Sequence, residues 1–160
     1  MNSLSSRRDF KKSEKFPILS GSVLWKINRI TISRLQEVTM LYSIKSNSEI
    51  TSIPHRREYN RWRSRLSDSE YQAILDDLNN RIDGTEIQTS SWIPGSDWSG
   101  TVFQPIYETA CEFSEASSGL FFGLIVWVVF MERPEWWSFG RYKKDGVPIK
   151  GITYFRINPH

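Results

Sequence analysis

The feature that most constrains the fold is a run of 16 uncharged residues, 116–131, between Glu115 and Glu132. As a helix this run is about 24 Å long, at about 1.5 Å per residue, whereas the hydrocarbon layer of a bilayer is about 30 Å thick. Its first three residues, Ala-Ser-Ser, are hardly apolar. A helix that is apolar on all sides is usually buried on all sides, so we predict a central core helix. A buried strand-like segment and a membrane-contacting helix are the alternatives.

A helix with one apolar side is predicted over residues 55–66. Tyr59, Trp62 and Leu66 lie at positions i, i+3 and i+7 and therefore share one side of such a helix. Much of the remaining surface of this helix is basic. Its arginines are Arg56, Arg57, Arg61, Arg63 and Arg65.

A second amphipathic helix follows directly and is acidic. Ser67 and Glu70 have the spacing of a capping box at its start, and Gly84 is the residue type that commonly ends a helix. Because few residues separate the two helices, they form a helical hairpin or a corner. We expect the carboxylates of the second helix to face the arginines of the first. These carboxylates are Glu70, Asp76, Asp77 and Asp83, and the apolar face is Tyr71, Ile74, Leu75, Leu78 and Ile82.

The C-terminal region is predicted to form an antiparallel hairpin. Residues 137–142 and 149–157 alternate as half-exposed strands do, and Lys144-Asp145-Gly146 between them is a hairpin-turn signal. Upstream, Pro105 begins a short predicted helix that ends near Phe113. The fold class is therefore α+β, with an N-terminal amphipathic helix pair, a buried central helix and a C-terminal antiparallel β-hairpin.

The first 52 residues differ from the rest of the chain. They are rich in Ser, Lys and Arg, and their apolar positions have no clean period. We expect residues 1–52 to be a basic, poorly ordered extension and residues 53–160 to be a single globular α+β domain. Met40 is then an alternative start of the chain. The stretch 16–21 is too weak for the apolar region of a secretory signal, and we expect a soluble, cytoplasmic protein.

The small net charge of +3 hides three blocks of opposite sign. Residues 1–66 hold 14 Lys/Arg and 5 Asp/Glu, residues 67–135 hold 2 and 12, and residues 136–160 hold 5 and 1. Either the blocks pair within the fold, or a basic surface binds a polyanion. Internal pairing is favoured, because the acidic block is large enough to neutralise its neighbours.

The chain lacks most of the residues that catalytic and metal sites commonly use. The single cysteine, Cys111, excludes a disulfide framework and a Cys-based zinc site, and His55 and His160 are the only imidazoles. Three glutamates recur at helical spacing with no further ligand beside them, which predicts a solvated helix face. They are Glu108, Glu112 and Glu115. We expect no metal site, no cofactor and no catalytic residue of a known motif.

Residues 84–104 form a long polar connection that contains several aromatic side chains. Leaving these in water is unfavourable, so we expect an ordered loop anchored by its tryptophans. Asp97 is predicted to be a turn residue that bonds its own backbone; the alternative is a general base or cation site in an aromatic pocket. The candidate pocket and contact residues are Trp92, Asp97, Trp98, Trp136, Trp137, Arg141 and Arg156.

Three function classes remain, in decreasing order of support. The first is a non-enzymatic protein-binding or regulatory module, whose surplus tryptophans contact another protein. The second is a sequence-independent nucleic-acid-binding protein that uses the arginines of helix 55–66. The third is an enzyme with its site around Asp97 or at the cluster of Glu108, Glu112 and Glu115. The sequence leaves the partner and the oligomeric state open.

Overall fold

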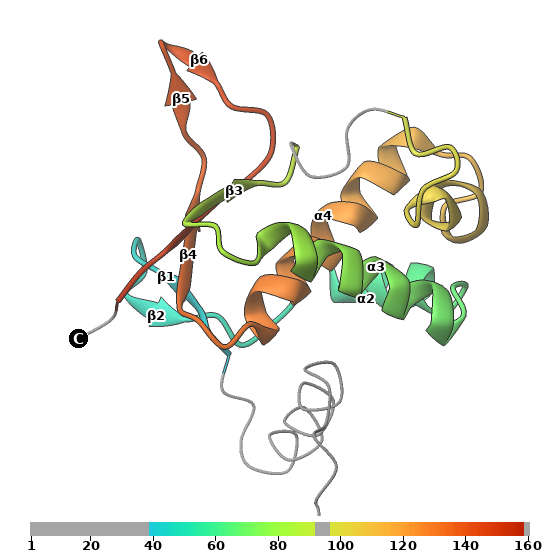
Figure 1. Cartoon of the computed structure of the whole chain (residues 1–160), viewed down its shortest axis with the longest axis horizontal. Coiled ribbons are helices and arrows are strands. Elements are labelled where there is room, and N and C mark those ends of the chain that lie inside the picture. The colour runs from blue at the N-terminus through green and yellow to red at the C-terminus, as the bar shows by residue number, and fades with distance from the viewer. Residues whose placement is uncertain (1–38, 92–96, 159–160) are drawn as a thin grey trace, which may run out of the picture. The chain divides into compact units, whose positions relative to one another are not determined.

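The computed structural model describes residues 39–91 and 97–158. These residues form helices and a sheet, which confirms the mixed α+β class (Figure 1). In chain order the elements are β1 (Leu41–Ser43), β2 (Ser48–Glu49), α2 (Arg56–Arg63), α3 (Asp68–Ile82), β3 (Ile87–Thr89), the π-helix η1 (Ile106–Ala110), α4 (Glu115–Glu132), β4 (Trp137–Gly140), β5 (Lys143–Lys144), β6 (Val147–Pro148) and β7 (Thr153–Arg156).

Helix α4 is the centre of the hydrophobic core. It begins after Ser114, whose side chain accepts a hydrogen bond from the backbone N–H of Ser117. From Phe121 to Met131 every residue except Gly123 is buried. Within the described part of the chain, α4 has the length and composition to cross a bilayer, and 61% of its apolar window is buried inside the protein. This burial favours a core helix over a membrane-contacting one.

Helix α2 packs its apolar side against α4. The rings of Tyr59 and Trp62 lie 5.9 and 5.6 Å from the ring of Phe121, and both side chains are buried, as their spacing predicts. The helix is shorter than predicted. Beyond Arg63 the backbone tightens, because the N–H groups of Arg65 and Leu66 donate to carbonyls three residues earlier.

Helix α3 begins and ends as its sequence indicates. The backbone N–H of Ser67 donates to Glu70 Oε2 over 2.8 Å, and the backbone N–H of Glu70 donates to Ser67 Oγ over 3.2 Å, which confirms the capping box. After the helix, Gly84 has a φ of 74°, a left-handed conformation that favours glycine. The five apolar residues predicted to face the core are all buried.

The main sheet has five strands in the order β2-β1-β4-β7-β3, with β1 and β4 parallel and the other neighbours antiparallel. One face packs on α4. There the ring of Phe130 stacks on Tyr154 at 4.0 Å and lies 4.8 Å from Trp137, while Trp127 lies 4.6 Å from Phe139. Contacts with α4 therefore fix the side of β4 and β7 that is internal.

The boundary predicted near residue 53 is too late in the chain. Residues 41–43 and 48–49 supply two strands of the sheet, and Leu41 is fully buried beside Trp137. Strands of two or three residues are too short to show an alternating pattern, so the sequence gives no signal for them. The part of the predicted extension before residue 39 lies outside the described residues.

The C-terminal hairpin is interrupted. Strands β4 and β7 pair antiparallel in the main sheet, and β5 and β6 form a separate two-stranded ribbon that projects beyond it (Figure 1). Asp145 and Gly146 both have positive φ, 52° and 79°, as a two-residue type I′ turn requires. The predicted return strand 149–157 is broken because Gly151 has a φ of 88° and its backbone passes close to Ser90.

The predicted helix between Pro105 and Phe113 is a π-helix, η1. The backbone N–H of Cys111 donates to the carbonyl of Ile106, five residues earlier, over 3.0 Å. Glu112 and Phe113 then both adopt left-handed backbone conformations, with φ of 52° and 65°. Apolar spacing does not distinguish these wider turns from an α-helix.

Candidate nucleic-acid interface

Three arginines form one exposed side of α2. Arg56, Arg57 and Arg61 are exposed, and at about 100° per residue they fall within about 140° of the helix surface. Among the described residues no carboxylate forms an ion pair with them. The guanidinium carbon of Arg61 lies 5.3 Å from the centre of the Trp62 ring, which is a cation–π contact with a buried aromatic residue.

The other two arginines of the predicted basic helix bind elsewhere in the fold. Arg63 Nη2 lies 2.6 Å from Asp68 Oδ1, and its guanidinium carbon is 4.1 Å from the ring of Tyr71. Arg65 Nη1 donates to the carbonyl of Ala110 over 2.8 Å and lies 3.3 Å from Glu112. These two side chains therefore join neighbouring elements, and the candidate interface is reduced to three arginines.

The expected neutralisation of α2 by the acidic side of α3 is wrong. Arg63 pairs with Asp68, but the four carboxylates named from the sequence have other partners. Glu70 caps its own helix, Asp76 accepts from Gln72 over 2.8 Å, Asp77 pairs with Arg81 at 2.6 Å, and Asp83 pairs with Arg133 at 2.7 Å. For Glu70, Asp76 and Asp77, partners three or four residues away in sequence are closer than a side chain on the next helix, whereas Asp83 pairs with Arg133 after the end of α4. The charges of the three exposed arginines are therefore not neutralised by an ion pair with a described residue.

Of the described tryptophans in the predicted contact surface, one is in the core and two are half-buried. Trp137 is 1% exposed and is a core residue. Trp98 is half-buried and packs against Phe103 and Phe122, with ring separations of 6.2 and 5.6 Å. Trp136 is half-buried, and Trp92 lies outside the described residues. The observed role of Trp98 is the loop anchor that the sequence predicts.

Asp97 has the geometry of a turn residue. Its Oδ1 accepts a hydrogen bond from the backbone N–H of Ser99 over 2.9 Å, and this bond lowers the pKa of Asp97. The side chain is exposed. Among the described residues no hydrogen bond or ion pair joins Asp97 to Arg141 or Arg156. Arg141 is exposed, and Arg156 Nη1 lies 3.5 Å from Glu86 Oε1.

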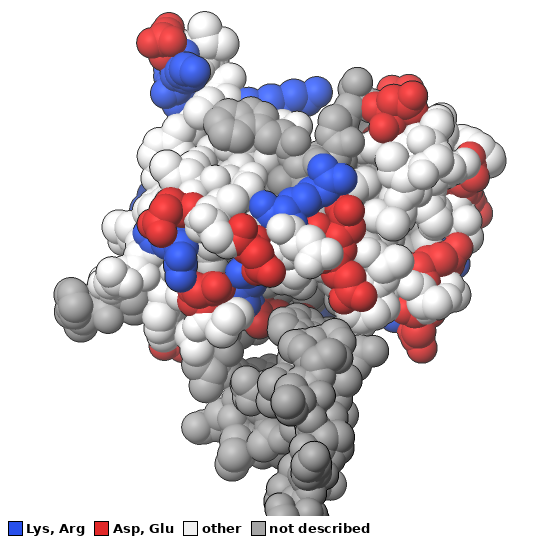
Figure 2. All heavy atoms as spheres, in the orientation of Figure 1, with Lys and Arg blue, Asp and Glu red and all other residues white. Residues whose placement is uncertain are grey.

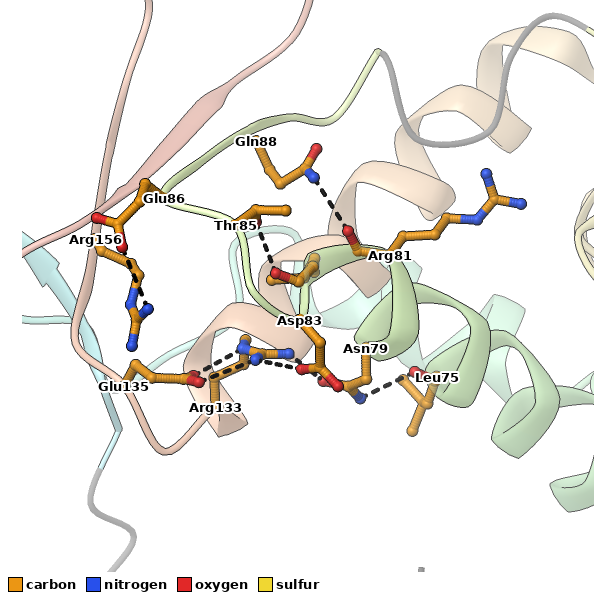
Figure 3. A network of polar contacts seen from close by, with 11 residues as sticks. Leu75, Asn79, Arg81, Asp83, Thr85, Glu86, Gln88, Arg133, Glu135 and Arg156 are labelled. Carbon is orange, nitrogen blue, oxygen red and sulfur yellow. Dashed lines mark hydrogen bonds and ion pairs between the residues drawn. The ribbon is translucent and has the colours of Figure 1, made fainter.

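Sequence reasoning missed Arg133, the most buried cation among the described residues, whose side chain is 5% exposed. Its Nη2 lies 2.7 Å from Asp83 Oδ1, its Nη1 donates to Asn79 Oδ1 over 3.0 Å, and its Nε donates to Glu135 over 2.9 Å (Figure 3). These bonds join the end of α3, the end of α4 and the approach to β4. No short-range spacing links Arg133 to residues fifty positions earlier.

Acidic side chains are prominent around α3. In Figure 2 they lie there with some basic atoms among them, and the outer end of the β5–β6 ribbon shows both basic and acidic atoms. An acidic surface repels polyanions, so α3 does not extend the α2 interface. The described residues also contain no group of three or more His, Cys, Asp or Glu that could hold a metal ion. The chain matches no protein-family model, no curated protein and no solved structure.

Proposed function

We propose that this protein binds nucleic acid without sequence preference, through Arg56, Arg57 and Arg61 of α2. The proposed framework comprises an amphipathic helix pair, a buried central helix and a C-terminal antiparallel hairpin. The observation that carries the proposal is the exposed side of α2, where three guanidinium groups have no acidic partner among the described residues. Guanidinium groups donate paired hydrogen bonds to phosphate oxygens.

The same geometry argues for phosphate contacts rather than base readout. Tyr59 and Trp62, the aromatic residues of α2, are buried against α4 and cannot stack on bases. Arginines alone then contact the backbone, which carries no sequence information. A nucleic-acid ligand is compatible with the proposed soluble, cytoplasmic state. The protein-binding alternative has less support, because Trp137 and Trp98 pack within the protein.

The proposal is tested by fluorescence anisotropy with a labelled DNA duplex, titrated at salt concentrations between about 50 and 200 mM. The wild type binds with a steep salt dependence. The Arg56→Ala/Arg57→Ala/Arg61→Ala variant binds more weakly, and the slope of log K against log salt falls by about 3, one for each lost phosphate contact. All three positions are exposed, so the variant is expected to fold.

Two variants control for general charge effects. Arg56→Lys/Arg57→Lys/Arg61→Lys keeps the charge and retains most of the salt slope. Lys45→Ala removes one exposed charge from the turn between β1 and β2, outside α2, and lowers duplex affinity much less than the single variant Arg61→Ala does. The proposal fails if the wild type does not bind duplex at the lowest salt, or if Lys45→Ala and Arg61→Ala lose the same affinity.

A further inference from the structure

The sheet has a second face, opposite the one that packs on α4. Tyr42, Ser138, Phe155 and Ile87 are register partners across β1, β4, β7 and β3, so their side chains form a row on this face. The ring contacts of α4 with the sheet go to the alternate residues, Trp137, Phe139 and Tyr154. We call the row and the adjacent Tyr142 the outer face.

Aromatic and apolar side chains remain partly open on the outer face. Ile87 is 59% exposed and Tyr142 is 45% exposed, while Tyr42 and Phe155 are half-buried. The rings of Tyr142 and Phe155 meet edge to face at 5.9 Å. A hydrophobic core would bury such rings, so their exposure points to contact with something outside the fold.

Gly140 makes room for one of these rings. A Cβ atom at position 140 would lie 2.8 Å from a ring carbon of Tyr142, which is too close for a real contact. Position 140 is two residues after Ser138 and therefore points to the outer face. The absence of a side chain at Gly140 therefore leaves room for the Tyr142 ring beside Phe155.

The outer face also has an unpaired polar group and a basic border. The hydroxyl of Ser138, in the row between Tyr42 and Phe155, is buried and has no hydrogen-bond partner. Around Tyr142, residues 141–150 carry four exposed cations and one exposed acid. These are Arg141, Lys143, Lys144 and Lys150, with Asp145 at the turn. At the other end of the row, Glu49 is next to Tyr42 on β2.

We infer that the outer face binds an unpaired nucleic-acid strand, with bases stacked on Tyr142 and Phe155 and phosphates near the basic border. Exposed rings accept the flat face of any base, and a positive groove or border follows the backbone. A duplex is excluded from this contact, because its bases are already stacked on each other. The positive charge beside Tyr142 favours a polyanion over an apolar protein surface.

This inference rests on the proposed function in one respect, namely that the ligand is a nucleic acid. The single-strand site consists of β-sheet residues, whereas the duplex interaction uses three arginines of α2. The two are separated by working in the Arg56→Ala/Arg57→Ala/Arg61→Ala background. Loss of duplex binding by that variant with retained single-strand binding supports both proposals.

The test compares labelled single strands of about 12 nucleotides: oligo-dT, oligo-rU, and an abasic strand with the same number of phosphates. Anisotropy titrations are expected to show tighter binding of both base-containing strands than of the abasic strand. Tyr142→Leu and Phe155→Leu each weaken that binding by about 5- to 150-fold, the range for loss of one stacked base, and leave abasic binding unchanged. The ratio of dT to rU affinity distinguishes DNA from RNA.

Phe113→Leu is the matched control, because Phe113 is a 65% exposed ring outside the outer face. It leaves all affinities unchanged. Circular dichroism and thermal unfolding establish that the leucine variants are folded. Equal binding of abasic and base-containing strands overturns the inference, as does an equal loss in Phe113→Leu. A concentration-dependent dimer in sedimentation that Tyr142→Leu abolishes also overturns it, because a second copy then occupies the face.

Discussion

At the scale of single residues, Arg133 shows how a cation can be buried. Burial acts to lower the pKa of Arg133, but its hydrogen bonds to Glu135 and Asp83 outweigh burial, and the pKa is raised. For Glu135, burial acts to raise the pKa, while the hydrogen bond and charge of Arg133 lower it, and the net shift is downward. Each partner therefore stabilises the charged form of the other.

Replacing Arg133 by Met is expected to lower the free energy of unfolding by about 2–3 kcal/mol, because hydrogen bonds to charged groups contribute about 1.5–3 kcal/mol. The lowered pKa of Glu135 means that its contribution is present above the ordinary Glu pKa of about 4.3 and is lost as pH falls through the folded-state value. Urea unfolding at neutral and acid pH measures both effects. Arg133→Lys keeps the charge but lacks the planar guanidinium group, and it serves as the control. Its free energy of unfolding should lie between those of the wild type and Arg133→Met. A smaller loss in Arg133→Met than in Arg133→Lys contradicts this account.

Cys111 is expected to be unreactive in the folded protein. The residue is 4% exposed, and burial raises the pKa of its thiol. Little reactive thiolate is therefore accessible at neutral pH. Alkylation of the native protein is therefore much slower than alkylation in denaturant, where the ordinary thiol pKa returns. Equal labelling rates in the two states contradict the prediction.

Side-chain burial could be predicted only where one helix presents a regular pattern. The spacing of Tyr59 and Trp62 places both on the core side, and the structure agrees. The partners of Arg65 could not be predicted in this way. Arg65 contacts Ala110 and Glu112, about 45 residues away, and no local rule links such positions. The same holds for Ser138 and Phe155, whose shared face depends on the strand register.

At the scale of elements, the capping box of α3 permits a direct test. Ser67→Ala removes the acceptor for the Glu70 N–H and is expected to lower the free energy of unfolding by about 1 kcal/mol. The Ser67 hydroxyl and backbone N–H both bond the Glu70 carboxylate and lower its pKa. The contribution of Glu70 is therefore present above the ordinary Glu pKa of about 4.3 and is lost as pH falls. Denaturant titrations across this range should show a weaker acid dependence in Ser67→Ala.

Asn80→Ala is the control for the cap, because Asn80 is exposed on the same helix and far from Ser67. Its stability should not fall, since alanine is a better helix former than asparagine. Destabilisation of both variants by the same amount would exclude a specific capping effect.

Long helices could be predicted from the sequence, whereas strands of two or three residues could not. Helices α3 and α4 repeat their patterns over several turns and have recognisable N-caps in Ser67 and Ser114. Strands β1 and β2 have three and two residues, which is too few for a period. The π-helix η1 was predicted as an ordinary helix, because the wider hydrogen-bond step between Ile106 and Cys111 leaves no distinct sequence pattern.

At the scale of the whole molecule, the buried tyrosines tie alkaline ionisation to unfolding. The pKa of Tyr71 is raised by burial and by the neighbouring Tyr59, and burial raises the pKa of Tyr154. Their stabilising contribution is complete below the ordinary Tyr pKa of about 10 and is lost as pH rises above it. Tyrosinate absorbance should therefore show a late phase that coincides with loss of the circular dichroism signal. Tyr154→Phe should reduce that late phase. Complete ionisation of all tyrosines before any loss of structure contradicts the prediction.

Sheet topology lay beyond sequence reasoning for a physical reason. The antiparallel partners β4 and β7 follow each other through a turn signal, so their association is local. The parallel pairing of β1 with β4 joins Leu41 to Trp137 across almost the whole described chain. Nothing in the composition of three residues specifies so distant a partner. The candidate interface was predictable in its residue type, but the choice of three free arginines out of five required the ion pairs.

The parallel pairing of β1 with β4 affects how the chain folds during its synthesis. A ribosome synthesises β1 before α2, α3, α4 and β4. The strand β1 therefore cannot pair with β4 until the helices between them have been synthesised. Contacts so far apart in sequence close slowly, since loop-closure entropy opposes them. A nascent chain halted before Trp137 therefore leaves β1 without its parallel neighbour, and its unpaired backbone is open to association with other chains.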